Sequence, residues 1–61
     1  MAARIREIRQ AKGLSQWELA QRTGIHPTNL YKIENGHLRL YDGWRRRIAE
    51  ALGVREEELK D

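Results

Sequence analysis

Apolar residues recur along this chain at the intervals of a helix. Trp44, Ile48 and Leu52 are spaced four apart, and Ile5 and Ile8 are three apart, so each set shares one helical face. Together with the turn residues between the apolar stretches, this pattern predicts an all-α fold. We expect a compact bundle of five short helices at residues 2–12, 16–23, 27–35, 43–52 and, last and shortest, close to 54–59.

Local capping signals set where the predicted helices begin and end. Ser15 is a good N-cap, and Glu18 follows three residues later, which completes a capping box for the second helix. Gly13 is the expected residue after the first helix, and Gly24 ends the second. Asp42 is the expected N-cap of the fourth helix. These signals place the second and third helices on either side of a tight glycine turn.

The third helix is predicted to have one buried face and one polar face. Pro27 is pre-set for the first helical position, and Leu30 and Ile33 face inward. Thr28 and Lys32 are four residues apart, so they share the opposite face. That polar side carries Pro27, Thr28, Tyr31, Lys32 and Asn35, with Asn29 at its edge.

Length and composition limit the chain to one small domain, which we expect to span residues 1–61. A domain of this size buries only about 60% of its unfolded surface, so little stability is in reserve. Hydrophobic residues make up 39% of the chain and charged residues 34%, which indicates a small core under a charged surface. Because there is no cysteine, disulfides and cysteine-based zinc sites are excluded, and no cofactor is expected.

The charge balance indicates which partners to expect. Twelve basic against nine acidic residues give a net charge of +3, which favours an anionic partner, nucleic acid before a membrane surface. A basic protein without a specific partner is the alternative. No apolar run approaches the roughly 20 residues that span a membrane, and the first residues lack the apolar core of a signal peptide. We therefore expect a cytoplasmic protein without membrane association.

Residues 15–36 resemble the helix-turn-helix of the phage-repressor and Cro-like (XRE-type) family of DNA-binding domains. Outside this segment, residues 5–9 and 48–54 look like the first and last helices of that family, so the resemblance covers nearly the whole chain. The order and spacing of the motifs carry the resemblance. The matching residues are Gln16, Leu19, Ala20, Gly24, Ile25, Leu30, Ile33, Glu34, Asn35 and Gly36.

The resemblance implies a domain that binds double-stranded DNA, with the third helix in the major groove and the second across the backbone. It implies a transcriptional regulator, most simply a repressor that binds an operator as a homodimer. A second interpretation is an antitoxin that binds a protein toxin and represses its own operon, and a third is a protein-interaction module that does not read DNA. In the family the C-terminal end often helps form the dimer, which makes Val54 and Leu59 candidate contacts here.

The resemblance also assigns roles to single residues. In the family an arginine at the position of Arg9 pairs with the glutamate that corresponds to Glu34, and such a two-pronged bond would tie the first helix to the end of the third. Gln16, in the first turn of the second helix, is expected to meet a phosphate beside free backbone N–H groups. On the third helix, Lys32 suits the guanine O6 and N7 acceptors, and Thr28 suits a polar base edge or a thymine methyl.

The other candidates for DNA contact flank this set. Asn29 is expected at a base edge or a phosphate, whereas Pro27 has no donor and offers only apolar contact. His26 stands where the family usually has serine or threonine, so it either caps the helix poorly or touches a phosphate. His37 and Arg39 follow the third helix and are candidates for backbone contact, with plain solvent exposure as the alternative.

Four features of the sequence lie outside the family pattern or at its edge. Trp17 replaces a polar residue, and it either lies along the sugar-phosphate backbone or covers neighbouring protein surface. Thr23 replaces an aliphatic residue and is expected to loosen the core slightly. Residues 45–47 are three arginines, and since consecutive helical residues point about 100° apart, we interpret them as mainly solvated, with one arginine of the run as a candidate phosphate contact. Tyr41 is expected to extend the buried stripe of the fourth helix.

We do not expect an enzyme. His26 stands apart from any carboxylate or nucleophile in a recognisable pattern, and His37 is too far along the chain to form a helical ligand pair with it. Nucleophile, base and orienting group therefore do not assemble, and no metal site is expected. The candidate DNA-contact residues are Gln16, Trp17, His26, Pro27, Thr28, Asn29, Tyr31, Lys32, Asn35, His37 and Arg39.

Overall fold

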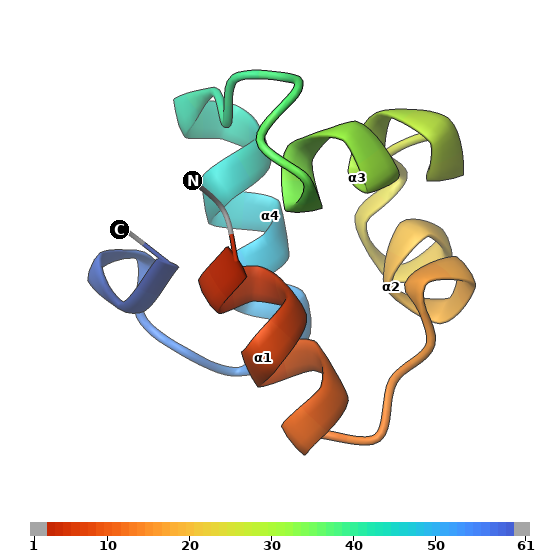
Figure 1. Ribbon diagram of the computed structural model, residues 1–61. Coiled ribbons are helices and arrows are strands. Elements are labelled where there is room, and N and C mark those ends of the chain that lie inside the picture. The colour runs from red at the N-terminus through yellow and green to blue at the C-terminus, as the bar shows by residue number, and fades with distance from the viewer. Residues whose placement is uncertain (1–2, 60–61) are drawn as a thin grey trace.

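In the computed structural model, which describes residues 3–59, four α-helices and a short 3₁₀ helix surround one core (Figure 1). The helices are α1 (Ala3–Ala11), α2 (Gln16–Thr23), α3 (Pro27–Glu34), α4 (Asp42–Leu52) and the 3₁₀ helix η1 (Glu56–Leu59). This part of the chain contains no strand, so the prediction of an all-α fold of five short helices is confirmed. The predicted helix start at Ala2 lies outside the described residues. None of the described helices combines the length and the apolar character needed to cross a membrane.

Short-range contacts fix both ends of α2. The hydroxyl of Ser15 accepts a hydrogen bond from the Glu18 backbone N–H, and the Glu18 carboxylate accepts one from the Ser15 backbone N–H, both at 3.0 Å. The expected capping box is therefore present. At the other end, Gly24 has a φ of 73°, and its N–H donates to the carbonyl of Ala20. Glycine takes this left-handed conformation without strain, which lets the chain turn sharply into α3.

The end of α3 is closed by backbone hydrogen bonds around Gly36. Gly36 has a φ of 76°, its N–H donates to the carbonyl of Ile33 at 3.2 Å, and the N–H of His37 donates to the carbonyl of Lys32 at 2.8 Å. Paired bonds of this kind form a Schellman motif, which satisfies carbonyl groups that the helix leaves free. The helix therefore ends cleanly before the loop that leads to α4.

The start of α4 differs from the prediction. Tyr41, which makes no side-chain capping bond, is the N-cap, and Asp42 is already helical. The Asp42 carboxylate lies 2.9 Å from the Arg45 guanidinium one turn on, and a negative charge in the first turn also suits the helix dipole. The assignment of Asp42 as the N-cap was therefore wrong. Tyr41 does not extend the buried stripe either, because it is exposed and its ring meets the Trp44 ring edge-on at the surface.

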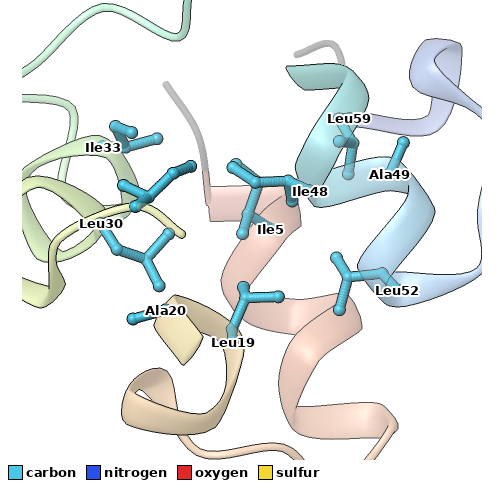
Figure 2. Packing of buried hydrophobic residues seen from close by; sticks show 10 residues of the cluster. Ile5, Leu19, Ala20, Leu30, Ile33, Ile48, Ala49, Leu52 and Leu59 are labelled. Carbon is cyan, nitrogen blue, oxygen red and sulfur yellow. The ribbon is translucent and has the colours of Figure 1, made fainter. Parts of the chain in front are cut away.

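One apolar core joins all five helices (Figure 2). On α4, Ile48 and Leu52 are buried as the spacing predicts, and Trp44 packs against the core while half-buried. The side chains in this core are Ile5, Leu19, Ala20, Ile25, Leu30, Ile33, Ile48, Ala49, Leu52 and Leu59. Because Leu59 of η1 is one of them, it is not available as the dimer contact that we expected, and Val54 is half-buried against the same core.

Thr23 makes hydrogen bonds within the core. Its hydroxyl is buried at the end of α2, donates to the carbonyl of Leu19 at 2.8 Å and accepts from the backbone N–H of Ile25 at 3.3 Å. A buried hydroxyl that is hydrogen-bonded in this way avoids the cost of an unpaired polar group. Thr23 therefore stabilises the turn between α2 and α3. Comparison with the aliphatic residue of the family does not predict these hydrogen bonds.

Candidate nucleic-acid interface

The polar face of α3 is exposed on the side opposite the core. Leu30 and Ile33 are completely buried, whereas Thr28, Tyr31 and Lys32 are exposed. Thr28 and Lys32 lie one turn apart on this outer face. A helix with its side chains is about 10–12 Å wide, which matches the roughly 12 Å width of the major groove of B-DNA. The shape and polarity of α3 therefore suit insertion into that groove.

The first turn of α3 is held by the histidine that precedes it. The Nδ1 atom of His26 accepts a hydrogen bond from the backbone N–H of Thr28 at 3.1 Å, and Pro27 occupies the first helical position. The sequence left a poor cap and a phosphate contact as alternatives, and in the structure the imidazole does serve as the N-cap. Because Nδ1 is the acceptor, the proton of the neutral ring is on Nε2. That N–H is a further donor on an exposed residue.

The start of α2 carries Gln16 and Trp17. Gln16 is half-buried, and its Nε2 donates to the Oε1 atom of Glu34 at 3.2 Å. The side chain of Trp17 is 63% exposed, so the indole does not mainly cover neighbouring protein. These two residues lie where α2 presents its free backbone N–H groups, which is where an anion binds a helix.

A buried ion pair joins α1 to the end of α3. The Nε and Nη2 atoms of Arg9 donate to the Oε2 and Oε1 atoms of Glu34 at 2.8 and 3.0 Å. The third guanidinium nitrogen, Nη1, donates to the carbonyl of Leu14 at 2.9 Å. Both side chains are buried, and within residues 3–59 no buried side-chain polar atom is left without a partner. The two-pronged contact therefore fixes α3 relative to α1.

Arg6 adds a second tie at the same end of α3, which the sequence reasoning missed. Its Nη2 donates to Asn35 Oδ1 at 2.8 Å, while the Nδ2 of Asn35 donates to the carbonyl of Tyr31 at 2.8 Å. Both polar atoms of the Asn35 side chain are thus engaged within the protein. The sequence does hold a sign of this contact. Arg6 and Arg9 are three residues apart and share one face of the helix, so both can face the end of α3.

The loop between α3 and α4 carries the last two candidates. His37 and Arg39 are exposed, and the Arg39 guanidinium lies 5.6 Å from the centre of the Tyr41 ring. Among the three consecutive arginines, Arg46 and Arg47 are exposed, whereas Arg45 is half-buried and paired with Asp42. The arginine run therefore does not form one continuous basic patch.

Among residues 3–59, no three His, Asp or Glu side chains gather as a metal site. The buried carboxylate, Glu34, already accepts hydrogen bonds from Arg9 and Gln16. Its surroundings suit a structural role rather than proton transfer, because both oxygens are engaged by fixed donors.

A comparison with known protein families identifies the family of the chain. The family model described as "Helix-turn-helix domain" matches residues 1–61. The chain belongs to this helix-turn-helix family. The match agrees with the resemblance to XRE-type domains, and it supports DNA as the partner of the domain and a binding rather than a catalytic role. No curated protein and no solved structure matches the chain.

Proposed function

We propose that this helix-turn-helix domain is a sequence-specific transcriptional regulator, in the simplest case a repressor that occupies an operator. The observation that carries the proposal is the exposed face of α3 with Thr28 and Lys32, backed by the buried side chains of Leu30 and Ile33. Figure 1 shows α2 and α3 as consecutive helices on one side of the domain. In the proposed complex α3 enters the major groove and α2 lies across the backbone.

Base selection is assigned to the exposed side chains of α3. Lys32 donates to O6 and N7 of a guanine, and Thr28 donates to or accepts from a base edge or contacts a thymine methyl. Pro27 and Tyr31 add apolar contact beside them. Each good two-pronged base contact contributes about 1–3 kcal/mol of discrimination, so these few side chains select a short half-site.

Phosphate contacts are assigned to the residues around α3. Gln16, Asn29, His37 and Arg39 supply side-chain donors, and the exposed His26 contributes its Nε2–H. The indole of Trp17 lies alongside the sugar-phosphate backbone in this arrangement. Asn35 is assigned a phosphate contact as well, because Arg6 uses its Oδ1 and the carbonyl of Tyr31 uses one hydrogen of its Nδ2, which leaves the second hydrogen available.

A dimer follows from the small number of base contacts in one domain. Half-sites one helical turn apart are separated by about 34 Å, and the Cα trace of the domain is 23 Å across, so two copies fit side by side. A groove of about 380 Å³ beside α4 and η1 is lined by side chains of both charge signs, among them Arg46, Arg55, Glu50 and Glu57. Mixed charges of this kind suit a self-complementary two-fold contact.

The test is selection of bound duplexes from a random-sequence pool at physiological salt. We expect enrichment of an inverted repeat whose half-sites are about one helical turn apart. Lys32→Glu should abolish the selected binding, whereas Lys12→Glu makes the same charge change at the exposed end of α1 and should leave most of it. A folded protein that enriches no sequence would contradict the proposal, and recovery of a stable protein partner from the native host would favour the antitoxin interpretation.

A further inference from the structure

Glu34 lies at the point where α1, α2 and α3 meet. Its side chain has 0% exposure, and its two oxygens accept three hydrogen bonds, two from Arg9 and one from the Nε2 of Gln16. The Nε of Arg6 lies 3.6 Å from the same oxygen that Gln16 contacts. One carboxylate on α3 therefore holds a side chain in the first turn of α2.

We infer that Glu34 is the positioning residue for the phosphate contact of Gln16, an inference that rests on the proposed DNA-binding function. A glutamine amide has a donor end and an acceptor end, and only the donor end binds a carboxylate. Glu34 therefore fixes both the rotamer of Gln16 and the flip of its amide. One hydrogen of Nε2 is used on Glu34, and the second is available for a phosphate oxygen.

The role of Arg9 follows from charge. An uncompensated carboxylate close to a phosphate would repel it, whereas the two-pronged contact with Arg9 neutralises Glu34 and holds it inward. Without that fixed acceptor, Gln16 would exchange among rotamers and would present its carbonyl oxygen to the phosphate part of the time. The ordering of Gln16 before binding lowers the entropic cost of the contact.

The first experiment measures the side chain directly in the unmodified protein. The NMR order parameter of the Gln16 Nε2 group should approach the value of about 0.85 that is typical of a rigid backbone, and those of Gln10 and Gln21 should lie below about 0.6. Gln10 and Gln21 are exposed glutamines on α1 and α2, so they are matched controls within the same chain. Equal mobility of all three amides would overturn the inference.

The second experiment tests the consequence for binding. We use a labelled duplex of mixed sequence at low salt, because phosphate contacts do not depend on sequence. Gln16→Ala should lower affinity roughly 10- to 100-fold in the wild-type background, as expected for one hydrogen bond to a charged group. In an Arg9→Met/Glu34→Leu background, where an apolar pair replaces the ion pair and keeps the core filled, it should lower affinity less than twofold.

The outcomes separate the inference from the proposed function. If wild-type protein does not bind the duplex, both are wrong. If it binds and Gln16→Ala costs the same factor in both backgrounds, or costs nothing in either, only the positioning role is wrong. Asn29→Ala removes a phosphate donor on α3 itself and serves as the control for a displaced helix, since its effect should be the same in both backgrounds. A parallel loss of the Gln16 and Asn29 effects would also overturn the inference.

Discussion

The two ends of α3 are held in very different ways. At its C-terminal end, Glu34 and Asn35 are tied to Arg9 and Arg6 of α1 through charged hydrogen bonds of 2.8–3.0 Å, most of them buried. At its N-terminal end, the side-chain cap is one exposed hydrogen bond from the Thr28 backbone to His26. A buried charged contact is much more costly to break than an exposed neutral one.

Because of this difference, the C-terminal end of α3 orients the helix and its N-terminal end is freer to adjust. The contacts at the tied end fix the orientation of α3 relative to α1. The hydrogen bond from Gln16 to Glu34 also connects this end to the first turn of α2. The lightly held end carries Pro27 and Thr28, which are the first side chains to face the groove in the proposed complex. We interpret α3 as anchored at its C-terminal end and adjustable at its N-terminal end, where the first of the proposed base contacts form. The predictions below break one end or the other.

The largest effect is expected at the buried ion pair. Arg9→Ala leaves the carboxylate of Glu34 buried without its main partner, which should cost about 3–5 kcal/mol of unfolding free energy. For a domain of this size, each 1 kcal/mol lowers the Tm by roughly 4–8 °C, so the variant should melt far below the wild type or be unfolded at 25 °C. Thermal unfolding followed by circular dichroism measures this.

Arg46→Ala is the matched control for that loss. The Arg46 side chain is 70% exposed and lies 3.9 Å from Glu56, so its removal should cost less than about 0.5 kcal/mol. Equal melting temperatures for the Arg9 and Arg46 variants would show that the buried pair does not stabilise the tied end.

The second prediction concerns the outer tie at the same end. Arg6→Ala removes the hydrogen bond to Asn35 but leaves the two-pronged Arg9–Glu34 contact in place, so the loss should be about 1 kcal/mol. Arg4→Ala, at an exposed position of the same helix, should change stability by less than about 0.5 kcal/mol. A loss at Arg6 as large as that at Arg9 would mean that the two arginines act as one unit.

The sequence predicts those features that depend on neighbours in the chain. The capping box of Ser15 and Glu18 and the turn at Gly24 involve residues at most four positions apart, and the structure has them as expected. The burial of Ile48 and Leu52 follows from their spacing for the same reason. The Arg9–Glu34 contact, across 25 residues, was expected only because the family resemblance implied it.

What the sequence does not predict depends on other parts of the fold. The partner of Gln16 lies 18 residues away and one partner of Asn35 lies 29 residues away, so spacing does not indicate that either amide is already hydrogen-bonded within the protein. Leu59 looked like an exposed dimer contact because its spacing gives no sign that η1 folds back onto α1 and α4. Asp42 has the chemistry of a cap, but in the structure the helix begins one residue earlier than expected, and the Asp42 carboxylate pairs with Arg45 instead.

The third prediction breaks the lightly held end of α3. His26→Ala removes the N-cap and should cost about 1 kcal/mol, the usual size for loss of a capping side chain. His26→Ser replaces the imidazole with a preferred capping group and should restore or exceed wild-type stability. His37→Ala, at an exposed loop position, is the matched control, and a loss as large as that of His26→Ala would contradict a capping role for His26.

The smallest effect is expected at the other exposed cap of the helix-turn-helix. The Ser15 backbone N–H, which donates to the carboxylate, holds the pKa of Glu18 below its ordinary value of 4.5, and the Ser15 side-chain contact and the charge of Arg22 act in the same direction. Because the folded pKa is the lower one, ionised Glu18 stabilises the fold above pH 4.5, and this contribution is lost as the pH falls through the folded value. Urea unfolding of wild type and Glu18→Gln measures this contribution. The wild type should be more stable at pH 7, and its advantage should narrow as the solution is acidified below pH 4.5. An advantage that stays constant would mean that the capping box does not depend on the charge of Glu18.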